Sequence, residues 1–493
     1  SVANDPGTAI AGTVSGTSIS FGSTIVYQST SAPYNTTLAY DTTNNKFVTA
    51  YQMSTGKGNA AVITMGQDEV TNLTATNLLG IASAAILDTA TGTGKPVILN
   101  SAGTVTQVSA VAAAIGSPTT FSTGNVDKLS GAFDINAGKF LIAYQDIAAA
   151  EYGYCVVGTV SGTTVSYGTP VVLNSATTYN TACIYDPDAQ KIVVSYSNGN
   201  IGTAVVATIS GTTVSFGTPV VFNTPGNTNY HSLSYDTAAN KVVFAYQNGG
   251  AADVGTARVA TVSGTSISFG TAVVFENAVT GYIGSVFDPN AGKVVMVYQD
   301  GGNSSYGTAI VGTVSATNIS FGSAVVYTSA SCRYNQVEYD TASTNVSIVY
   351  QNEATTYGNG IVGTVSGTSM TFGTAVAWNA VDTNAISTAY NSAAGTTCIT
   401  YYEVVAKQPT LIEASISGTT ISFNTKVVLD TFSGTPPTGA VSSCFDSTND
   451  SLISFWNDPD STNDGSSIVT IQGYTSLTAT NFIGISDAAI SDT

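Results

Sequence analysis

The amino-acid sequence predicts an all-β protein, a β-propeller built from four-stranded blades of about 50 residues each. Two repeated features carry this prediction. A Ser-Gly-Thr turn recurs at nearly constant spacing, and a corner made of an aromatic residue followed by Asp or Asn recurs eight times. Between these points, short runs of Val, Ile, Tyr and Phe alternate with Ser and Thr, which is the pattern of strands and not of helices.

The turns set the length of the repeat. From the second turn onward, their central residues are separated by 49, 53, 52, 51 and 51 positions, and the first gap of 146 is close to three such steps. The central residues are Gly16, Gly162, Gly211, Gly264, Ala316, Gly367 and Gly418. A tandem of β-sandwiches would need about 100 residues per domain, roughly twice this period.

The corners define eight repeat units. They are Tyr40-Asp41, Phe133-Asp134, Tyr185-Asp186, Tyr235-Asp236, Phe287-Asp288, Tyr339-Asp340, Tyr390-Asn391 and Phe445-Asp446. We expect the Asp carboxylate to accept hydrogen bonds from the backbone N–H groups just ahead and so to close a turn. Residues tolerant of positive φ follow at Gly138, Asn240, Gly292 and Gly395. A lysine then opens the second strand as part of an exposed hairpin tip, at Lys46, Lys139, Lys191, Lys241 and Lys293.

Each unit contains four runs that resemble strands, and the rhythm breaks between residues 71 and 122. Residues 73–89 and 477–493 share 12 of 17 positions, so each piece resembles the end of an array. We therefore divide the chain into an N-terminal blade-like unit (1–66), a linker or insertion (67–100), seven further blades (101–474) and a C-terminal exit segment (475–493). Residues 80–86 could form one or two helical turns.

The number of blades in the ring is seven or eight. The spacing favours seven blades with residues 17–65 as a separate unit. A lone blade would, however, leave two apolar faces in water, at a cost on the order of 25 cal/mol per Å². This burial argument favours eight blades in one ring.

Composition excludes several classes of function. Lys and Arg total 12 against 30 Asp and Glu, a net charge of −18, which disfavours binding to nucleic acid and to anionic membranes. The longest apolar runs are far shorter than the roughly 20 residues of a membrane-spanning helix. The Ser, Thr, Asn and Gly content is typical of extracellular β proteins. Five cysteines at unrelated spacings (Cys155, Cys183, Cys332, Cys398 and Cys444) are interpreted as small buried side chains.

No catalytic residue, cofactor or metal is predicted. The single histidine, His231, lies where other units have Asn35, Asn180 or Asn335, and is interpreted as a repeat-surface residue and not as a general base. Phosphate-binding glycine motifs are absent from the sequence, and no carboxylate pair is singled out for glycoside hydrolysis. The acidic run 457–464 lacks the spacing of a calcium loop and is interpreted as solvated.

One recurring feature offers a candidate binding surface. The second strand of several units ends in a tyrosine followed by an amide and an amide or acid, a set suited to stacking on a sugar and sharing its hydroxyl hydrogen bonds. These residues are Tyr144, Gln145, Asp146, Tyr246, Gln247, Asn248, Tyr298, Gln299, Asp300, Tyr350, Gln351 and Asn352, and Tyr51-Gln52 follows the same pattern. The alternative, in which Tyr packs in the core and the amides satisfy backbone groups, is the favoured interpretation.

The phrases GTAIVGTVSATNISFGSAVVY (307–327), YDTAANKVVFAYQ (235–247) and LTATNFIGISDAAISDT (477–493) resemble a repeat family of structural and tail-fibre-like proteins of marine bacteriophages. The resemblance covers nearly the whole chain. It implies a virion or cell-surface appendage role. We therefore expect a non-enzymatic protein located outside the cell, whose partners are other subunits of the same assembly and, through multivalent contacts, a cell-surface glycan. The resemblance transfers no catalytic residue. The alternative is a secreted propeller that binds or cleaves carbohydrate.

Overall fold

The computed structural model describes residues 7–15, 18–28, 34–41, 46–52, 58–63, 96–99, 105–107, 110–111, 113–433, 441–472, 474–475 and 482–485. The chain divides into two compact units, one made of residues 1–111 and 474–493 and the other of residues 112–473. The short helical segment considered for residues 80–86 lies outside the described residues.

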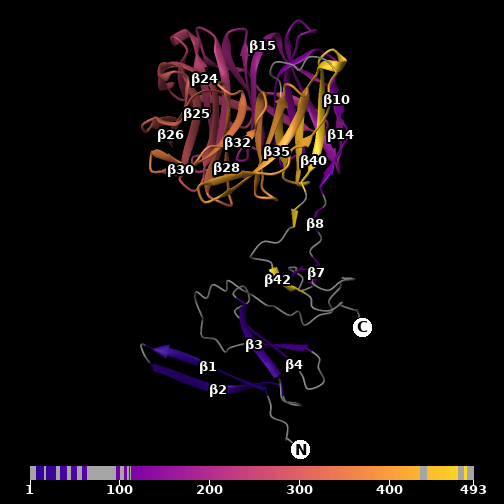
Figure 1. The fold of residues 1–493 in the computed structure, drawn as a ribbon, viewed down its shortest axis with the longest axis vertical. Coiled ribbons are helices and arrows are strands. Elements are labelled where there is room, and N and C mark those ends of the chain that lie inside the picture. Colours follow the sequence, from indigo (N-terminus) through magenta and orange to yellow (C-terminus); the bar gives the residue numbers. More distant parts are fainter. Residues whose placement is uncertain are drawn as a thin grey trace, which may run out of the picture. The chain divides into compact units, whose positions relative to one another are not determined.

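The larger unit is a β-propeller, and its described residues form seven blades (Figure 1). The first strand of each blade contacts the first strand of the next, and the first strand of blade 7 contacts that of blade 1, which closes the circle. In blade order these strands are β11 (Val126–Asp134), β15 (Val171–Asp186), β20 (Thr228–Asp236), β24 (Val273–Asp288), β28 (Val325–Asp340), β33 (Thr383–Asn391) and β38 (Val441–Asp446).

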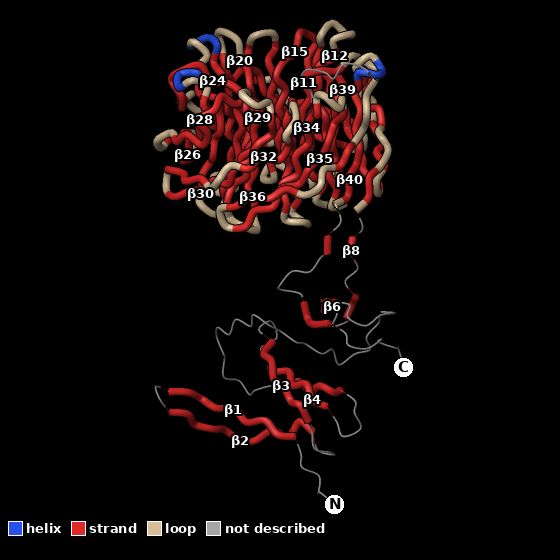
Figure 2. Tube along the Cα trace, in the orientation of Figure 1, coloured by secondary structure: helices blue, strands red, loops and turns tan. Residues whose placement is uncertain are grey.

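The second and third strands of each blade follow as antiparallel neighbours. The second strands are β12 (Lys139–Asp146), β16 (Lys191–Asn198), β21 (Lys241–Asn248), β25 (Lys293–Asp300), β29 (Asn345–Asn352), β34 (Thr396–Glu403) and β39 (Ser451–Asp458). The third strands are β13 (Tyr152–Ser161), β17 (Ile201–Ser210), β22 (Val254–Ser263), β26 (Tyr306–Ser315), β30 (Tyr357–Ser366), β35 (Gln408–Ser417) and β40 (Asp464–Ile471). Short 3-10 helices η1 (Gly249–Ala251), η2 (Gly301–Asn303) and η3 (Pro459–Ser461) connect second to third strands at one end of the ring (Figure 2).

The fourth strand is interrupted, which the sequence pattern did not indicate. A four-residue segment pairs with the end of the third strand, and after a break at a glycine or asparagine a second segment pairs with the start of the same strand. The first segments are β14 (Thr164–Tyr167), β18 (Thr213–Phe216), β23 (Ser266–Phe269), β27 (Asn318–Phe321), β31 (Ser369–Phe372) and β36 (Thr420–Phe423). The second segments are the starts of β15, β24 and β28 together with β19 (Val220–Asn223), β32 (Val376–Asn379) and β37 (Val427–Val428).

Blade 7 takes its outer strands from the opposite end of the unit. Both β9 (Ala114–Ile115) and β10 (Thr119–Ser122) pair with β40, and Figure 1 shows β10 beside the yellow β40. This pairing completes a circle of seven blades. Of the two alternatives, seven or eight blades in the ring, the described residues therefore match seven, and residues 17–65 belong to the smaller unit.

The smaller unit also consists of antiparallel strands. The β3–β4–β5 sheet repeats the order and the Asp41–Lys46 corner of a blade. Residues 96–111, which the sequence pattern assigned partly to the blades, contribute strands here. The strands are β1 (Gly7–Ser15), β2 (Ser18–Gln28), β3 (Tyr34–Asp41), β4 (Lys46–Gln52), β5 (Gly58–Ile63), β6 (Pro96–Leu99), β7 (Val105–Gln107), β8 (Ala110–Val111), β41 (Tyr474–Thr475) and β42 (Phe482–Ile485).

The core of the ring lies between neighbouring blades. One cluster joins Val193 and Phe222 of blade 2 to Val242 and Phe244 of blade 3. Since each sheet is covered on both faces, the second strands are buried almost without alternation, as their sequences predict. The cysteines are free; four are buried and Cys183 is partly buried, which confirms their interpretation as packing residues.

The corners have the predicted turn chemistry. A carboxylate oxygen of Asp236 accepts hydrogen bonds from the backbone N–H groups of Ala238 and Ala239, both at 2.9 Å. Asn240 then has a φ of 52°, the left-handed conformation expected at this position. The Lys241 ammonium donates to the Asn240 carbonyl at 3.1 Å, so this lysine completes the turn.

Candidate functional site

The tyrosines proposed as stacking platforms are core residues. Tyr144, Tyr246, Tyr298 and Tyr350 are at most 2% exposed. Each packs against an aromatic ring on the outer strand of the preceding blade, as in the pair Tyr246–Phe222, whose ring centroids are 5.1 Å apart. The other pairs are Tyr144–Phe121, Tyr298–Phe275 and Tyr350–Tyr327. These rings cannot stack on a ligand, and their proposed binding role is corrected to packing between blades.

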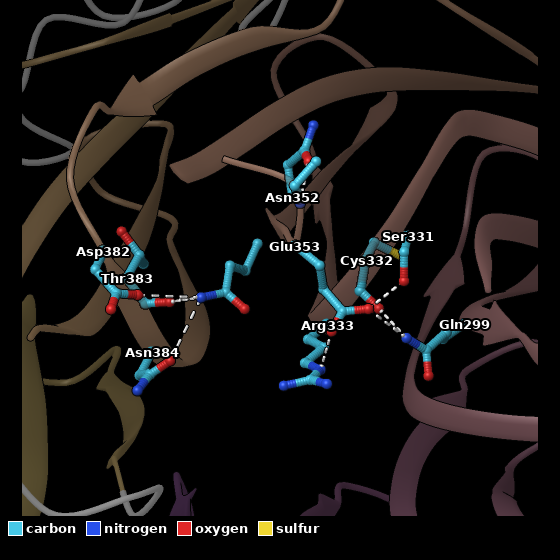
Figure 3. Close-up of polar contacts among 11 residues, drawn as sticks. Gln299, Ser331, Cys332, Arg333, Asn352, Glu353, Asp382, Thr383 and Asn384 are labelled. Carbon is cyan, nitrogen blue, oxygen red and sulfur yellow. Dashed lines mark hydrogen bonds and ion pairs between the residues drawn. The ribbon is translucent and has the colours of Figure 1, made fainter. Parts of the chain in front are cut away.

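The glutamines that follow these tyrosines connect adjacent blades. The side-chain amides of Gln247, Gln299 and Gln351 donate to the carbonyls of Thr280, Cys332 and Thr383, at 2.8, 2.7 and 2.6 Å. Each acceptor is the first paired residue of the next blade's inner strand. Figure 3 shows Gln299 directed toward Cys332. The equivalent nitrogen of Gln145 is buried and has no hydrogen-bond partner among the described residues.

The third residue of each set closes the turn into the third strand. Asp300 accepts from the N–H of Gly302 at 2.9 Å, and Asn248 accepts from that of Gly250 at 3.2 Å. Asp146 and Asn352 accept from the N–H groups two residues ahead, both at 3.0 Å. All twelve predicted residues thus lie at one end of the ring, where they pack between blades, connect blades or close turns. The repeat continues in three sets that the sequence analysis did not include: Tyr196-Ser197-Asn198, Tyr401-Tyr402-Glu403 and Trp456-Asn457-Asp458.

At the same end, each inner strand of blades 1 to 6 carries a β-bulge. The register shifts around the third residue of the part that pairs with the second strand, and that residue has positive φ in every case. A bulge redirects the side chain that it carries. The residues are Lys128, Asn180, Tyr230, Tyr282, Tyr334 and Ala385. Since the backbone geometry is common to all six and the side chains differ, the bulge is architectural and its side chain is available for function.

Three successive blades place a tyrosine on the bulge, and we name Tyr230, Tyr282 and Tyr334 the tyrosine arc. The ring centroids of Tyr230 and Tyr282 are 4.9 Å apart, and those of Tyr282 and Tyr334 are 5.3 Å apart. All three side chains are partly exposed. Burial, with a smaller contribution from Tyr282, raises the pKa of Tyr230 to about 12. Its hydroxyl is therefore neutral and able to donate at physiological pH.

Polar groups flank the arc. Asn180 donates to the side-chain oxygen of Asn229 at 3.1 Å, and Asn229 donates to that of Gln247 at 2.9 Å. Beside Tyr334, the half-exposed Arg333 forms an ion pair with Glu353 (Figure 3). The Glu353 carboxylate also accepts from Ser331 and, at 3.2 Å, from Gln299. Aromatic faces bordered by amides and by one ion pair form a surface able to stack on, and hydrogen-bond to, a polyhydroxylated ligand.

His231 lies in the junction between blades 2 and 3, where it is partly exposed. Its ring nitrogens are each 3.2 Å from a hydroxyl, of Ser195 and of Ser197. Burial lowers the pKa of His231 to about 4, so the ring is neutral at physiological pH. Its hydrogen bonds connect two blades, as those of the glutamines do.

The acidic run at 457–464 uses one carboxylate within its own turn and another in a contact with the loop at Ser433. Asp458 accepts from the N–H of Asp460 at 2.9 Å, and Asp460 accepts from the N–H of Ser433 at 2.8 Å. Among the described residues, no group of three or more His, Cys, Asp or Glu side chains is placed to hold a metal ion. In the part of the chain that the structure describes, no helix has the length and hydropathy needed to span a membrane.

Comparison with known proteins identifies similar folds only. No family model and no curated protein matches the chain. A structure from Lactobacillus plantarum shares 13% identity over 68% of this chain and 94% of its own, with a TM-score of 0.44. The Dos1 propeller shares 10% over 89% and 95%, with a TM-score of 0.42. The β-propeller domain of Myceliophteria thermophila Cps50 (Swd1) shares 9% over 71% and 98%, with a TM-score of 0.45. No function follows from these similarities.

Proposed function

We propose that this protein is a non-enzymatic binding module of an extracellular assembly, a virion or cell-surface appendage, and that it binds carbohydrate at the tyrosine arc. The arc carries the proposal. Three aromatic rings from successive blades lie side by side, partly exposed, at a position where the fold itself does not require tyrosine. Tyrosine supplies a large contact area at low conformational-entropy cost.

The asymmetry of the ring supports this assignment. Blades 1, 2 and 6 carry Lys128, Asn180 and Ala385 at the bulge, so the aromatic side chains occupy one arc of the ring and not its whole circumference. The hydrogen bond from Asn229 to Gln247 and the ion pair of Arg333 with Glu353 lie beside these tyrosines. A purely structural ring would need no such concentration of one side chain at equivalent positions.

The test is binding of the full chain to an array of immobilised glycans, followed by calorimetric titration of the best oligosaccharide. The Tyr282→Ala variant should lose about tenfold in affinity, because stacking on one aromatic ring contributes on the order of 1.5 kcal/mol. Tyr357→Ala, at an exposed tyrosine outside the arc, is the matched control and should bind as the unmodified protein does. Equal binding by both variants would remove the arc from the site.

The alternative is a secreted propeller that cleaves carbohydrate. Incubation with the bound oligosaccharide distinguishes the two, since an appendage releases no sugar and an enzyme releases it catalytically. Electron microscopy of the native assembly tests the appendage role itself. Particles or filaments that contain this chain support it, whereas a strictly monomeric protein with no such association contradicts it.

A further inference from the structure

The β3–β4–β5 sheet of the smaller unit is built like a blade of the ring. Its strands pair in the register of a blade, so Val62 lies opposite Val48. In blade 3 the same register places Val259 opposite Val243. Each position of the sheet can therefore be compared with the equivalent position in the ring, where a neighbouring blade covers it.

The exposure of Val62 differs from that of its equivalents in the ring. Val62 is 52% exposed. The valines at the same position in blades 1 to 5 are at most 1% exposed, because they pack against the next blade. These residues are Val157, Val206, Val259, Val311 and Val362. The same side chain in the same register is thus buried where a second blade covers it and half exposed in the smaller unit.

The side chains around Val62 form an apolar surface. Residues opposite each other in an antiparallel sheet point to the same side, and side chains two positions apart share that side. Ala39, Val48, Ala50 and Ala60 therefore lie on the face of Val62. All five are partly or largely exposed, and we name them the open face. In the ring, the corresponding face is the one that contacts the next blade.

Polar residues at the border of the open face occupy positions that join blades in the ring. Thr37 is exposed, and its equivalent Ser232 exchanges a hydrogen bond of 2.9 Å with Ser285 of the next blade. Gln52 is also exposed, and its equivalent Gln247 donates to a backbone carbonyl of the next blade. The open face therefore has the apolar and the polar groups through which this repeat packs on itself.

The chain offers one surface that matches the open face, which is the open face of a second copy. The first strands of the ring form a closed circle, so each blade there already has a neighbour on either side. The opposite face of the β3–β4–β5 sheet is also unsuited, because Thr49, Tyr51 and Ile63 are buried on it. Two copies related by a twofold axis can bring their open faces together.

Charge favours contact between copies at this place. The chain has a net charge of −18, so two copies repel each other over most of their surface. The strands β3, β4 and β5 contain one acid, Asp41, and one base, Lys46, and the open face contains neither. Its association buries apolar side chains without removing a charge from water.

We propose that the protein forms a twofold dimer in which the open faces of two smaller units pack against each other. The valines of one copy lie against the alanines of the other, so that large side chains meet small ones. This dimer specifies one contact of the extracellular assembly proposed above. It carries two rings, and with them two tyrosine arcs that can bind one surface together.

The experiment is sedimentation velocity of the full chain over a range of concentrations. The unmodified protein should pass reversibly from one chain to two as its concentration rises. Val62→Lys removes an apolar contact from each copy and adds two ammonium groups to the interface, so it should raise the dissociation constant by about tenfold or more. Val221→Lys, at a valine that is 49% exposed on β19 of the ring, is the matched control and should leave the dimer unchanged.

Hydrogen exchange provides a second measurement that needs no substitution. Amides of residues 46–63 should gain protection as the concentration rises, and amides of the ring should not. At high dilution, Val62→Lys should exchange these amides as slowly as the unmodified protein does, which shows that the variant folds.

The proposal is overturned if the full chain stays monomeric, if Val62→Lys associates as tightly as the unmodified protein, or if Val221→Lys weakens the dimer equally. It is also overturned if the concentration-dependent protection falls on the ring. Tyr282→Ala should leave the dimer unchanged, and Val62→Lys should leave the calorimetric affinity for the oligosaccharide unchanged. A chain that is monomeric alone and still occurs in particles would overturn the dimer and not the appendage role.

Discussion

Replacing Glu338 with Gln should change how the stability of the ring depends on pH. Glu338 lies on the inner strand β28, where its carboxyl accepts a hydrogen bond from Thr388 of the next blade at 3.1 Å. Burial raises its pKa from 4.5 to about 7. Because the folded pKa lies above the unfolded one, the contribution of this carboxyl to stability is complete below pH 4.5 and is lost as pH rises through about 7.

The size of the effect follows from the shift. About 2.5 pKa units at about 1.36 kcal/mol each correspond to roughly 3 kcal/mol, reached above the folded pKa. The Glu338→Gln variant cannot ionise and should not show this loss. Its free energy of unfolding, taken relative to the unmodified protein, should therefore increase by about 2–3 kcal/mol between pH 4.5 and pH 8.

Urea unfolding followed by tryptophan fluorescence measures this difference. Both tryptophans of the chain, Trp378 and Trp456, lie in the cores between blades, so the signal reports the ring. Subtracting the two proteins at each pH removes the titration of every other group. A difference that stays constant from pH 4.5 to pH 8 would refute the reasoning, because it would show that folding does not perturb this carboxyl.

Three further substitutions test the frame of the ring, each by urea unfolding. Gly217→Ala should lower the free energy of unfolding by about 1–3 kcal/mol, because the new Cβ meets the Thr265 carbonyl of the next blade; an unchanged free energy of unfolding would contradict this account of the break in the fourth strand. Asp236→Ala removes the acceptor of two backbone N–H groups and should cost about 1–2 kcal/mol, and a neutral result would show that the turn closes without it. Gln351→Ala should cost about 1 kcal/mol through loss of its inter-blade hydrogen bond, and an unchanged free energy of unfolding would show that this bond does not stabilise the ring.

Much of the fold could be predicted because its local rules repeat. The Asp236 corner, the positive φ of Asn240 and the unbroken burial of the second strands depend on contacts between residues close in sequence, and repetition made them visible. The interruption of the fourth strand was missed, because the reason for its glycine lies in the turn of the next blade.

The candidate site was harder to predict for the opposite reason. Alignment of the repeats draws attention to positions that stay the same, such as Tyr246-Gln247, and the structure shows that these are constant because they hold blades together. The tyrosine arc occupies a position that varies from Lys128 to Ala385. The available signal was this variation: tyrosine occurs at that position in three successive units.

The sequence by itself determined the class of fold, the repeat length and the chemistry of each corner, because these follow from side chains that bond to backbone a few residues away. Only the tertiary structure decided the number of blades in the ring, which depends on β10 meeting β40 across more than 300 residues. The packing of blade against blade placed three tyrosines side by side. Contacts between segments so distant have no local pattern, so no reading of the strands alone could locate them.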